Sequence, residues 1–147
     1  MLELKTFKEF LIERSAPITK TEYKQCDELV ELVSQSKIKN IADVHKLIQK
    51  GCSPDSMNIG RKTVLILMVQ RTRGNWDYFD IKEFLETHNP NVNAQDVRGA
   101  TALHFACIRD DIRLVELLLK YNADKDILDK QGNPPKHYAG VNTRHLV

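Results

Sequence analysis

Histidine side chains are the groups in this sequence best suited to acid–base or metal chemistry, and there are five of them. A catalytic or zinc-binding histidine needs a carboxylate, a thiol or a second imidazole within reach. His45, His88 and His145 have no carboxylate or cysteine partner at a useful local spacing. The sequence contains neither a glycine-rich phosphate loop nor a G-x-S-x-G motif. We therefore predict no enzyme and no cofactor, although spacing alone leaves open a catalytic group assembled from distant positions.

Cysteine is the second residue type with chemical potential. The chain has three, Cys26, Cys52 and Cys107, which are far apart in sequence and form no C-x-x-C pair. No histidine lies close enough to any of them to suggest a zinc site. The expected state is three reduced, partly buried thiols in a cytosolic-type compartment, with no bound metal.

Composition sets broad limits on what the protein does. The 147 residues are 41% hydrophobic and 29% charged, as in an ordinary soluble domain, and they suffice for one core. The formal net charge of +2 is too small to argue for nucleic acid or a membrane surface. No apolar run approaches the roughly 18 to 20 residues that span a bilayer, and the N-terminus lacks the apolar segment of a secretory signal. We expect an intracellular, cytoplasmic protein with no membrane insertion.

An internal repeat supplies the frame that must position these side chains. A shift of 33 residues superimposes Asp96 on Asp129, Gly99 on Gly132, His104 on His137, and Ala106 on Ala139. A period of this length is typical of a helix pair that stacks on copies of itself. Because His104 and His137 occupy equivalent positions, we expect both to be structural and to bond the backbone of the turn before them.

Each part of the repeated unit has a physical role. Asp96-Val-Arg-Gly99 predicts a turn, since Asp bonds its own backbone and Gly supplies positive φ. Thr101 is the expected N-cap of a first helix, and a second helix is expected to begin near Asp111. This second helix is apolar on more than one narrow stripe, as packing between repeats requires. Asn122 is expected to end it in the left-handed conformation.

Two segments of this unit resemble a known family. Asp96-Val-Arg-Gly-Ala-Thr-Ala-Leu-His-Phe-Ala106 and Leu114-Val-Glu-Leu-Leu-Leu-Lys-Tyr-Asn-Ala-Asp124 are similar to the ankyrin repeat patterns D-x-x-G-x-T-P-L-H-x-A and V-x-x-L-L-x-x-G-A-D. The match covers residues 96–128, with Ala102 where the family has proline. The resemblance implies an all-α ankyrin-repeat solenoid of stacked helix pairs with short turn or hairpin loops. It also implies a non-enzymatic protein–protein interaction module, a scaffold or adaptor.

The same frame divides residues 1–147, taken as a single domain, into segments. These are an N-terminal capping helix at 1–20, a degenerate repeat at 21–57, a repeat at 58–95 with an insertion near 73–77, the clear repeat at 96–128 and a partial repeat at 129–147. Residues 2–14 predict an amphipathic helix that either caps the stack or docks a partner. The repeat at 58–95 has Ile66 in place of His and Met68 in place of Ala. Residues 145–147 indicate a helix that is just starting, so the chain is either degenerate there or cut from a longer protein.

The resemblance implies a binding surface on the concave side of the stack, formed by turn tips and first helices. The positions that it assigns to this surface are Arg61, Lys62, Gln70, Arg71, Val97, Arg98, Ala100, Ile108, Arg109, Lys130, Gln131, Asn133, Val141 and Asn142. No Asp or Glu is among them. Because Arg binds carboxylates with two hydrogen bonds, one interpretation is a site for an acidic segment of another protein. The alternative is an ordinary solvated surface.

The insertion is a second candidate for partner binding. Trp76, the single tryptophan, lies there with Tyr78 and Phe79. Aromatic side chains anchor many protein interfaces, so Trp76 and Tyr78 are candidate contacts. Alternatively, Trp76 folds back over a short core. Phe79, at the start of the next helix, is expected in the core.

Two other functions remain beside the interaction module. In the first, the chain is a substrate- or host-targeting ankyrin fragment of a larger enzyme, or of a pathogen effector in the cytoplasm of a host cell. In the second, the basic groove binds nucleic acid, which is disfavoured because few aromatic residues alternate with its charges. Nothing in the sequence indicates a small-molecule substrate.

Overall fold

The computed structural model describes residues 20–35, 37–38, 40–70 and 76–147. Within these ranges it has seven α-helices and no β-strand. In chain order the helices are α2 (Lys20–Ser34), α3 (Ile41–Gln49), α4 (Val64–Gln70), α5 (Tyr78–His88), α6 (Ala102–Ile108), α7 (Ile112–Lys120) and α8 (Pro135–Tyr138). The helix predicted at 2–14 lies outside the described residues.

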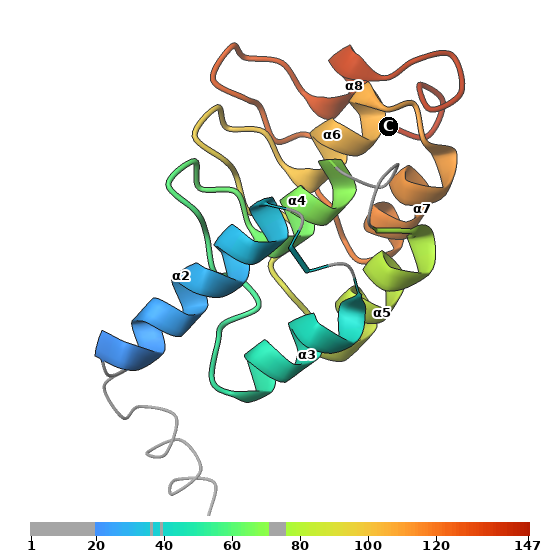
Figure 1. Ribbon diagram of the computed structural model, residues 1–147. Helices are drawn as coiled ribbons and strands as arrows, with labels where there is room; N and C mark the ends of the chain where they lie inside the picture. Colours follow the sequence, from blue (N-terminus) through green and yellow to red (C-terminus); the bar gives the residue numbers. More distant parts are fainter. Residues whose placement is uncertain (1–19, 36, 39, 71–75) are drawn as a thin grey trace, which may run out of the picture.

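The helices form two rows, which Figure 1 shows. Helices α2, α4, α6 and α8 pack against one another in chain order, and α5 packs against α7 beside them. Each first helix also packs on its own partner, α2 on α3, α4 on α5 and α6 on α7. The loops before α4, α6 and α8 project from the same side of the stack. The prediction of an all-α stack of helix pairs is confirmed.

A single apolar core runs through the stack. Helix α4 buries six consecutive residues, 64–69, because it packs against α2, α5 and α6. Helix α7 buries a stripe made of Leu114, Val115, Leu117 and Leu118. Removing apolar surface from water stabilises a fold by about 25 cal/mol per Å², so these stripes hold adjacent repeats together. Among the described helices, none is both long enough and apolar enough to cross a membrane.

Backbone hydrogen bonds join the turns of successive repeats. The Val97 amide donates to the Gly60 carbonyl at 3.0 Å, and the Lys130 amide donates to the Arg98 carbonyl at 2.9 Å. Gly99 has a φ of 78° and packs so closely on the next turn that a Cβ there would lie 2.9 Å from the Lys130 nitrogen. The turn tips therefore form a continuous row along one edge of the stack.

The ends of the helices are fixed by side chains and by left-handed residues. The Leu114 amide donates to the Asp111 carboxylate at the start of α7, and Asn122 after the end of α7 has a φ of 62°. Both features agree with the sequence prediction. Asn89 ends α5 in the same way, with a φ of 44°. Asparagine adopts this conformation more readily than most other residues.

The C-terminal segment differs from the expectation of a new helix at 145–147. After α8 the chain continues in turns and not in a second helix. The Asp110 carboxylate holds this segment, because it accepts hydrogen bonds from the Asn142 and Thr143 amides and from the Thr143 hydroxyl. These bonds, the Thr143 hydroxyl first, hold the pKa of Asp110 below its ordinary value. Asp110 thus supplies the acceptor that the amides of Asn142 and Thr143 need.

Candidate functional site

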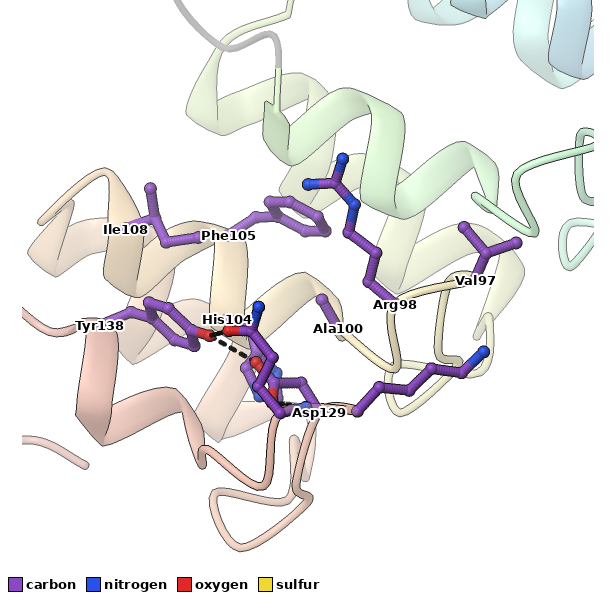
Figure 2. A pocket seen from close by; sticks show the side chains of 10 residues that line it. Val97, Arg98, Ala100, His104, Phe105, Ile108, Asp129 and Tyr138 are labelled. Atoms are coloured by element: carbon purple, nitrogen blue, oxygen red, sulfur yellow. Dashed lines mark hydrogen bonds between the residues drawn. The ribbon is translucent and has the colours of Figure 1, made fainter.

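A groove of about 450 Å³ lies between the turns and first helices of the last two repeats (Figure 2). Its lining consists of Val97, Arg98, Ala100, His104, Phe105, Ile108, Asp129, Lys130, Gln131 and Tyr138. The structure therefore brings together six residues that the sequence assigned to the binding surface, namely Val97, Arg98, Ala100, Ile108, Lys130 and Gln131. It adds Phe105 and Tyr138, which the sequence did not assign to it.

One part of the groove is apolar. Ile108 is 55% exposed at the end of α6, and Phe105 is half-buried one turn earlier. Figure 2 shows these two side chains on α6 with the Tyr138 ring of α8 close by. An exposed aliphatic side chain beside two aromatic rings offers a hydrophobic surface to a partner.

The charged part of the groove follows from the geometry of the turn. Asp96 is only 3% exposed, because its carboxylate accepts hydrogen bonds from the Arg98 and Ala100 amides at 2.8 and 3.0 Å. The Arg98 side chain is exposed, and Figure 2 shows it rising from the turn toward Phe105. Lys130 is exposed on the next turn. In the turn before α6, the acidic side chain of Asp96 is therefore buried and the basic side chain of Arg98 is exposed.

Asp129 lines the groove but is already engaged. Its carboxylate accepts hydrogen bonds from the Tyr138 hydroxyl and from the Gln131 and Asn133 amides. These bonds, the Tyr138 bond first, hold the pKa of Asp129 below its ordinary value. Asp129 therefore keeps its negative charge, but its oxygens already accept three hydrogen bonds and offer a partner few free acceptor sites.

Two predicted residues of the preceding repeat, Lys62 and Gln70, lie next to the groove but not in its lining. The Lys62 ammonium donates to Gln70 Oε1 at 3.1 Å and lies 5.8 Å from the centre of the Phe105 ring. Arg61, also assigned to the surface, is exposed on the turn before α4. The structure therefore places Lys62 beside Phe105 of the groove, with Gln70 as its hydrogen-bond partner. Arg71 lies outside the described residues.

Arg109 has a role different from the predicted one. Its guanidinium donates from Nη1 to the Gln70 carbonyl at 3.1 Å, across the boundary between repeats. Its Nε is buried and has no acceptor among the described residues. Arg109 therefore ties the end of α4 to α6 and is not a free basic side chain of the groove. The sequence indicated its position correctly but not the carbonyl that would engage it.

The aromatic residues predicted at the insertion do not form one site, because some lie in the core and others on the surface. Trp76 is 1% exposed and belongs to the core, so it is not an accessible anchor. Phe79 is 66% exposed, so its expected core position is wrong. The reason is helix phase, since Phe79 lies two residues before the buried Ile81 and so on the opposite side of α5. Tyr78 is half-buried beneath the guanidinium of Arg113, which lies 4.3 Å from the centre of its ring.

The repeat histidines have different roles. His104 is fully buried, its Nδ1 accepts a hydrogen bond from the Thr101 amide at 3.1 Å, and its Nε2 lies 3.2 Å from the Asn133 carbonyl of the next repeat. Burial lowers the pKa of His104. Its predicted structural role is confirmed. His137 is exposed, so the predicted equivalence is wrong, because Pro134 stands where a threonine would fix the ring.

A histidine pair that local spacing did not predict lies between α3 and α5. His45 Nδ1 is 2.6 Å from His88 Nε2, and His45 Nε2 is 2.9 Å from Glu83 Oε1. Burial, and then the neighbouring His45, lower the pKa of His88. Because His45 lies on α3 and its partners His88 and Glu83 lie on α5, these contacts form a polar link between two repeats. Among the described residues no group of three side chains could hold a metal ion. Predicting the contact between His45 and His88 from sequence would have required a correct alignment of the repeats at 21–57 and 58–95.

Comparison with known proteins shows the family. The family model described as ankyrin repeats in three copies matches residues 31–129 and, in an overlapping placement, residues 73–146. The chain therefore belongs to the ankyrin repeat family. Repeats of this family generally form non-catalytic domains that bind other proteins.

Similar curated proteins share repeats with this chain and extend far beyond it. A putative ankyrin repeat protein of Acanthamoeba polyphaga mimivirus is 46% identical over 50 residues, which cover 34% of this chain and 12% of that protein. The ankyrin repeat and LEM domain-containing protein 1 homolog of Caenorhabditis elegans is 41% identical over 68 residues, which cover 46% of this chain and 10% of that protein. The E3 ubiquitin-protein ligase KEG of Arabidopsis thaliana is 47% identical over 49 residues, which cover 33% of this chain and 3% of that protein. Some relatives are therefore parts of enzymes.

Proposed function

We propose that this protein is a non-enzymatic interaction module, a scaffold or adaptor, whose groove binds an acidic segment of another protein. The observation that carries the proposal is the exposed Ile108 beside the exposed bases Arg98 and Lys130 in one groove. Apolar contact supplies affinity, and the bases favour carboxylates over other side chains. The family's general use in protein binding supports the same conclusion.

The dimensions of the groove indicate what kind of segment fits. A volume of about 450 Å³ accommodates a few side chains and not the face of a whole domain. We therefore expect a short segment that inserts an apolar side chain between Phe105, Ile108 and Tyr138. Its carboxylates would face the guanidinium of Arg98 and the ammonium of Lys130. Such a pairing steers association and selects the partner more than it adds affinity.

Selection from a random peptide display library tests this proposal without a known partner. Enriched peptides should combine Asp or Glu with an apolar or aromatic residue. When one of them is titrated into the protein, backbone amide chemical shifts should change at residues 97–108 and 130–138. Peptides that are enriched for Lys and Arg, or shifts confined to α5 and α7, would contradict the proposal.

A second candidate function is that of a targeting part within a larger enzyme or effector. The similarity to short stretches of much longer proteins, among them an E3 ubiquitin-protein ligase, favours it. The groove would then hold the substrate or host protein while another part of the same polypeptide performs the chemistry. Immunoblotting of the native protein distinguishes the two candidates, because a mass far above 16.9 kDa would support the second.

A further inference from the structure

Two of the three thiols meet in the first repeat. Cys26 lies on α2 and is half-buried, and its Sγ donates to the Gly51 carbonyl at 3.9 Å. Cys52 directly follows Gly51, so this contact places the two cysteines close together, and Cys26 is among the neighbours that raise the pKa of the Cys52 thiol. The third thiol, Cys107, is fully buried on α6. The sequence predicted three reduced, partly buried thiols, but it could not show that two of them meet, because they are 26 positions apart and only the fold brings them together.

The two paired thiols differ in their access to solvent. Burial first, and then the contact with Cys26, raise the pKa of Cys52 to about 12. Cys52 is 4% exposed, whereas Cys26 is only half-buried. A reagent in solution therefore meets Cys26 first, with Cys52 behind it as the thiol that resolves the product. Burial also raises the pKa of Cys107, to about 11, and Cys107 lies in a different repeat.

We propose that Cys26 and Cys52 are a reversible modification site that forms an intramolecular disulfide with a small-molecule disulfide, such as glutathione disulfide, as the oxidant. The Cys26 thiolate attacks one sulfur of the oxidant and forms a mixed disulfide, and one glutathione leaves as a thiol. The Cys52 thiol then loses its proton and attacks the Cys26 sulfur, which expels the second glutathione. Two protein thiols are oxidised to one disulfide, and their two protons end on the two glutathione thiols.

The disulfide would fasten α2 to the loop that follows α3. These segments are the two halves of the first repeat, in whose described residues no counterpart of the bonds between His104, Thr101 and Asn133 is found. A cross-link between positions 26 apart restricts the unfolded chain and so favours the folded first repeat. The groove lies in the last two repeats, so oxidation should stabilise the stack without altering the groove.

The test oxidises the full chain with glutathione disulfide, blocks the remaining thiols with an alkylating reagent and maps the peptides by mass spectrometry. A monomer in which the peptides of Cys26 and Cys52 are joined, with Cys107 alkylated after unfolding, is the expected result. The urea midpoint should rise on oxidation and return when dithiothreitol is added. Cys107→Ser should still form the cross-link between Cys26 and Cys52 and show the same rise in urea midpoint on oxidation, although the buried serine lowers the midpoint of both forms.

Cys26→Ser and Cys52→Ser supply the matched negative controls. Neither variant should show the rise in urea midpoint with glutathione disulfide. The proposal is overturned if the parent yields only a glutathione adduct on Cys26, a disulfide that includes Cys107, a dimer between chains, or no oxidation. Because the mapping uses the parent chain, poor folding of a variant does not affect this outcome.

Discussion

Helix α6 of the clear repeat and helix α4 of the repeat before it have the same length and the same place in the stack, but different forces hold them. In α6, His104 bonds the Thr101 backbone and the next repeat. In α4 the equivalent residue is Ile66, and six consecutive residues are buried without a comparable polar network. The comparison teaches that apolar burial can replace the polar part of the repeat pattern, so the fold persists where the pattern is weak.

The two turns before these helices differ in the same sense. The Asp96 carboxylate accepts two backbone amide bonds, and Gly99 takes the left-handed position with a φ of 78°. In the earlier turn Asn58 Oδ1 accepts one such bond, from the Lys62 amide, and Arg61 takes the left-handed position with a φ of 54°. The earlier turn therefore keeps its shape with one fewer hydrogen bond from a backbone amide to the side chain, and with an arginine where glycine would adopt the positive φ more easily.

The largest predicted effect tests whether stacking is equally strong in the two repeats. Leu118 and Leu85 occupy equivalent places in α7 and α5, and both are buried. Replacing either with Ala should lower the free energy of unfolding by about 2–5 kcal/mol, because each change opens a cavity between packed helices. Ile112→Ala, on the exposed side of α7, is the control and should cost less than about 0.5 kcal/mol. A loss this small for Leu118→Ala in urea melts would contradict the core assignment.

The next effect compares two glycines with the same backbone conformation. Gly132, with a φ of 80°, has nothing within 4 Å of its added Cβ, whereas Gly99 packs on the next turn. Gly132→Ala should cost about 1 kcal/mol from conformation alone. Gly99→Ala should cost more, up to about 3 kcal/mol, because the new methyl group also meets the Lys130 backbone. Equal losses in the urea melts of the two variants would show that the close approach of the turns is not important.

A third prediction replaces His104 of the clear repeat with isoleucine, the residue type found at the equivalent position 66 of the earlier repeat. His104→Ile should lower the free energy of unfolding by about 1–3 kcal/mol, because the Thr101 amide and the Asn133 carbonyl lose their partner. Unchanged stability would mean that apolar burial alone suffices in both repeats.

The same variant has a signature in pH. Burial lowers the pKa of His104 and of His88, so the unfolded chain takes up protons at a higher pH than the folded chain. Stability should therefore fall as pH decreases below about 6.5, the ordinary pKa of histidine, and should stop falling below the folded pKa. His104→Ile should lose less stability than the parent between about pH 7.5 and pH 5. An identical pH dependence would contradict the role of burial at His104.

The smallest predicted effect is a gain. Arg61→Gly should raise the free energy of unfolding by about 0.5–1 kcal/mol, because glycine adopts a positive φ without strain. The control is Arg98→Gly, at an exposed turn position outside the left-handed region, which should not stabilise the protein. A loss of stability in Arg61→Gly would show that the arginine side chain makes a contact worth more than the strain.

Roles that depend on a few neighbouring residues were predictable from sequence. The Asp96 turn, the buried His104 and the left-handed Asn122 all follow from contacts close in the chain. The pair Cys26 and Cys52 was not predictable, because it depends on how α2 meets the loop after α3 in a repeat without the family pattern.

The groove was predictable only in part. Repeat phase placed Arg98, Ile108 and Lys130 on one face, because that face recurs with the period of the repeat. It missed Tyr138, since the last repeat departs from the family pattern there. It also misjudged Phe79, because the phase of α5 turns Phe79 away from the side that buries Ile81, and Arg109, because the Gln70 carbonyl that Arg109 engages is 39 positions away in sequence.

The most direct test of the groove is the affinity of a display-selected acidic peptide measured by calorimetry. The double variant Arg98→Glu/Lys130→Glu reverses two exposed charges without touching the core. The variant Lys46→Glu/Lys120→Glu, on the second helices, makes the same change in net charge elsewhere, and circular dichroism checks that both variants fold. We expect the groove variant to bind at least about tenfold more weakly, a loss of about 1.4 kcal/mol that shrinks at high salt, and the control to bind like the parent. Equal affinity of the folded groove variant and the parent would contradict the account, because the basic face would then be ordinary solvated surface.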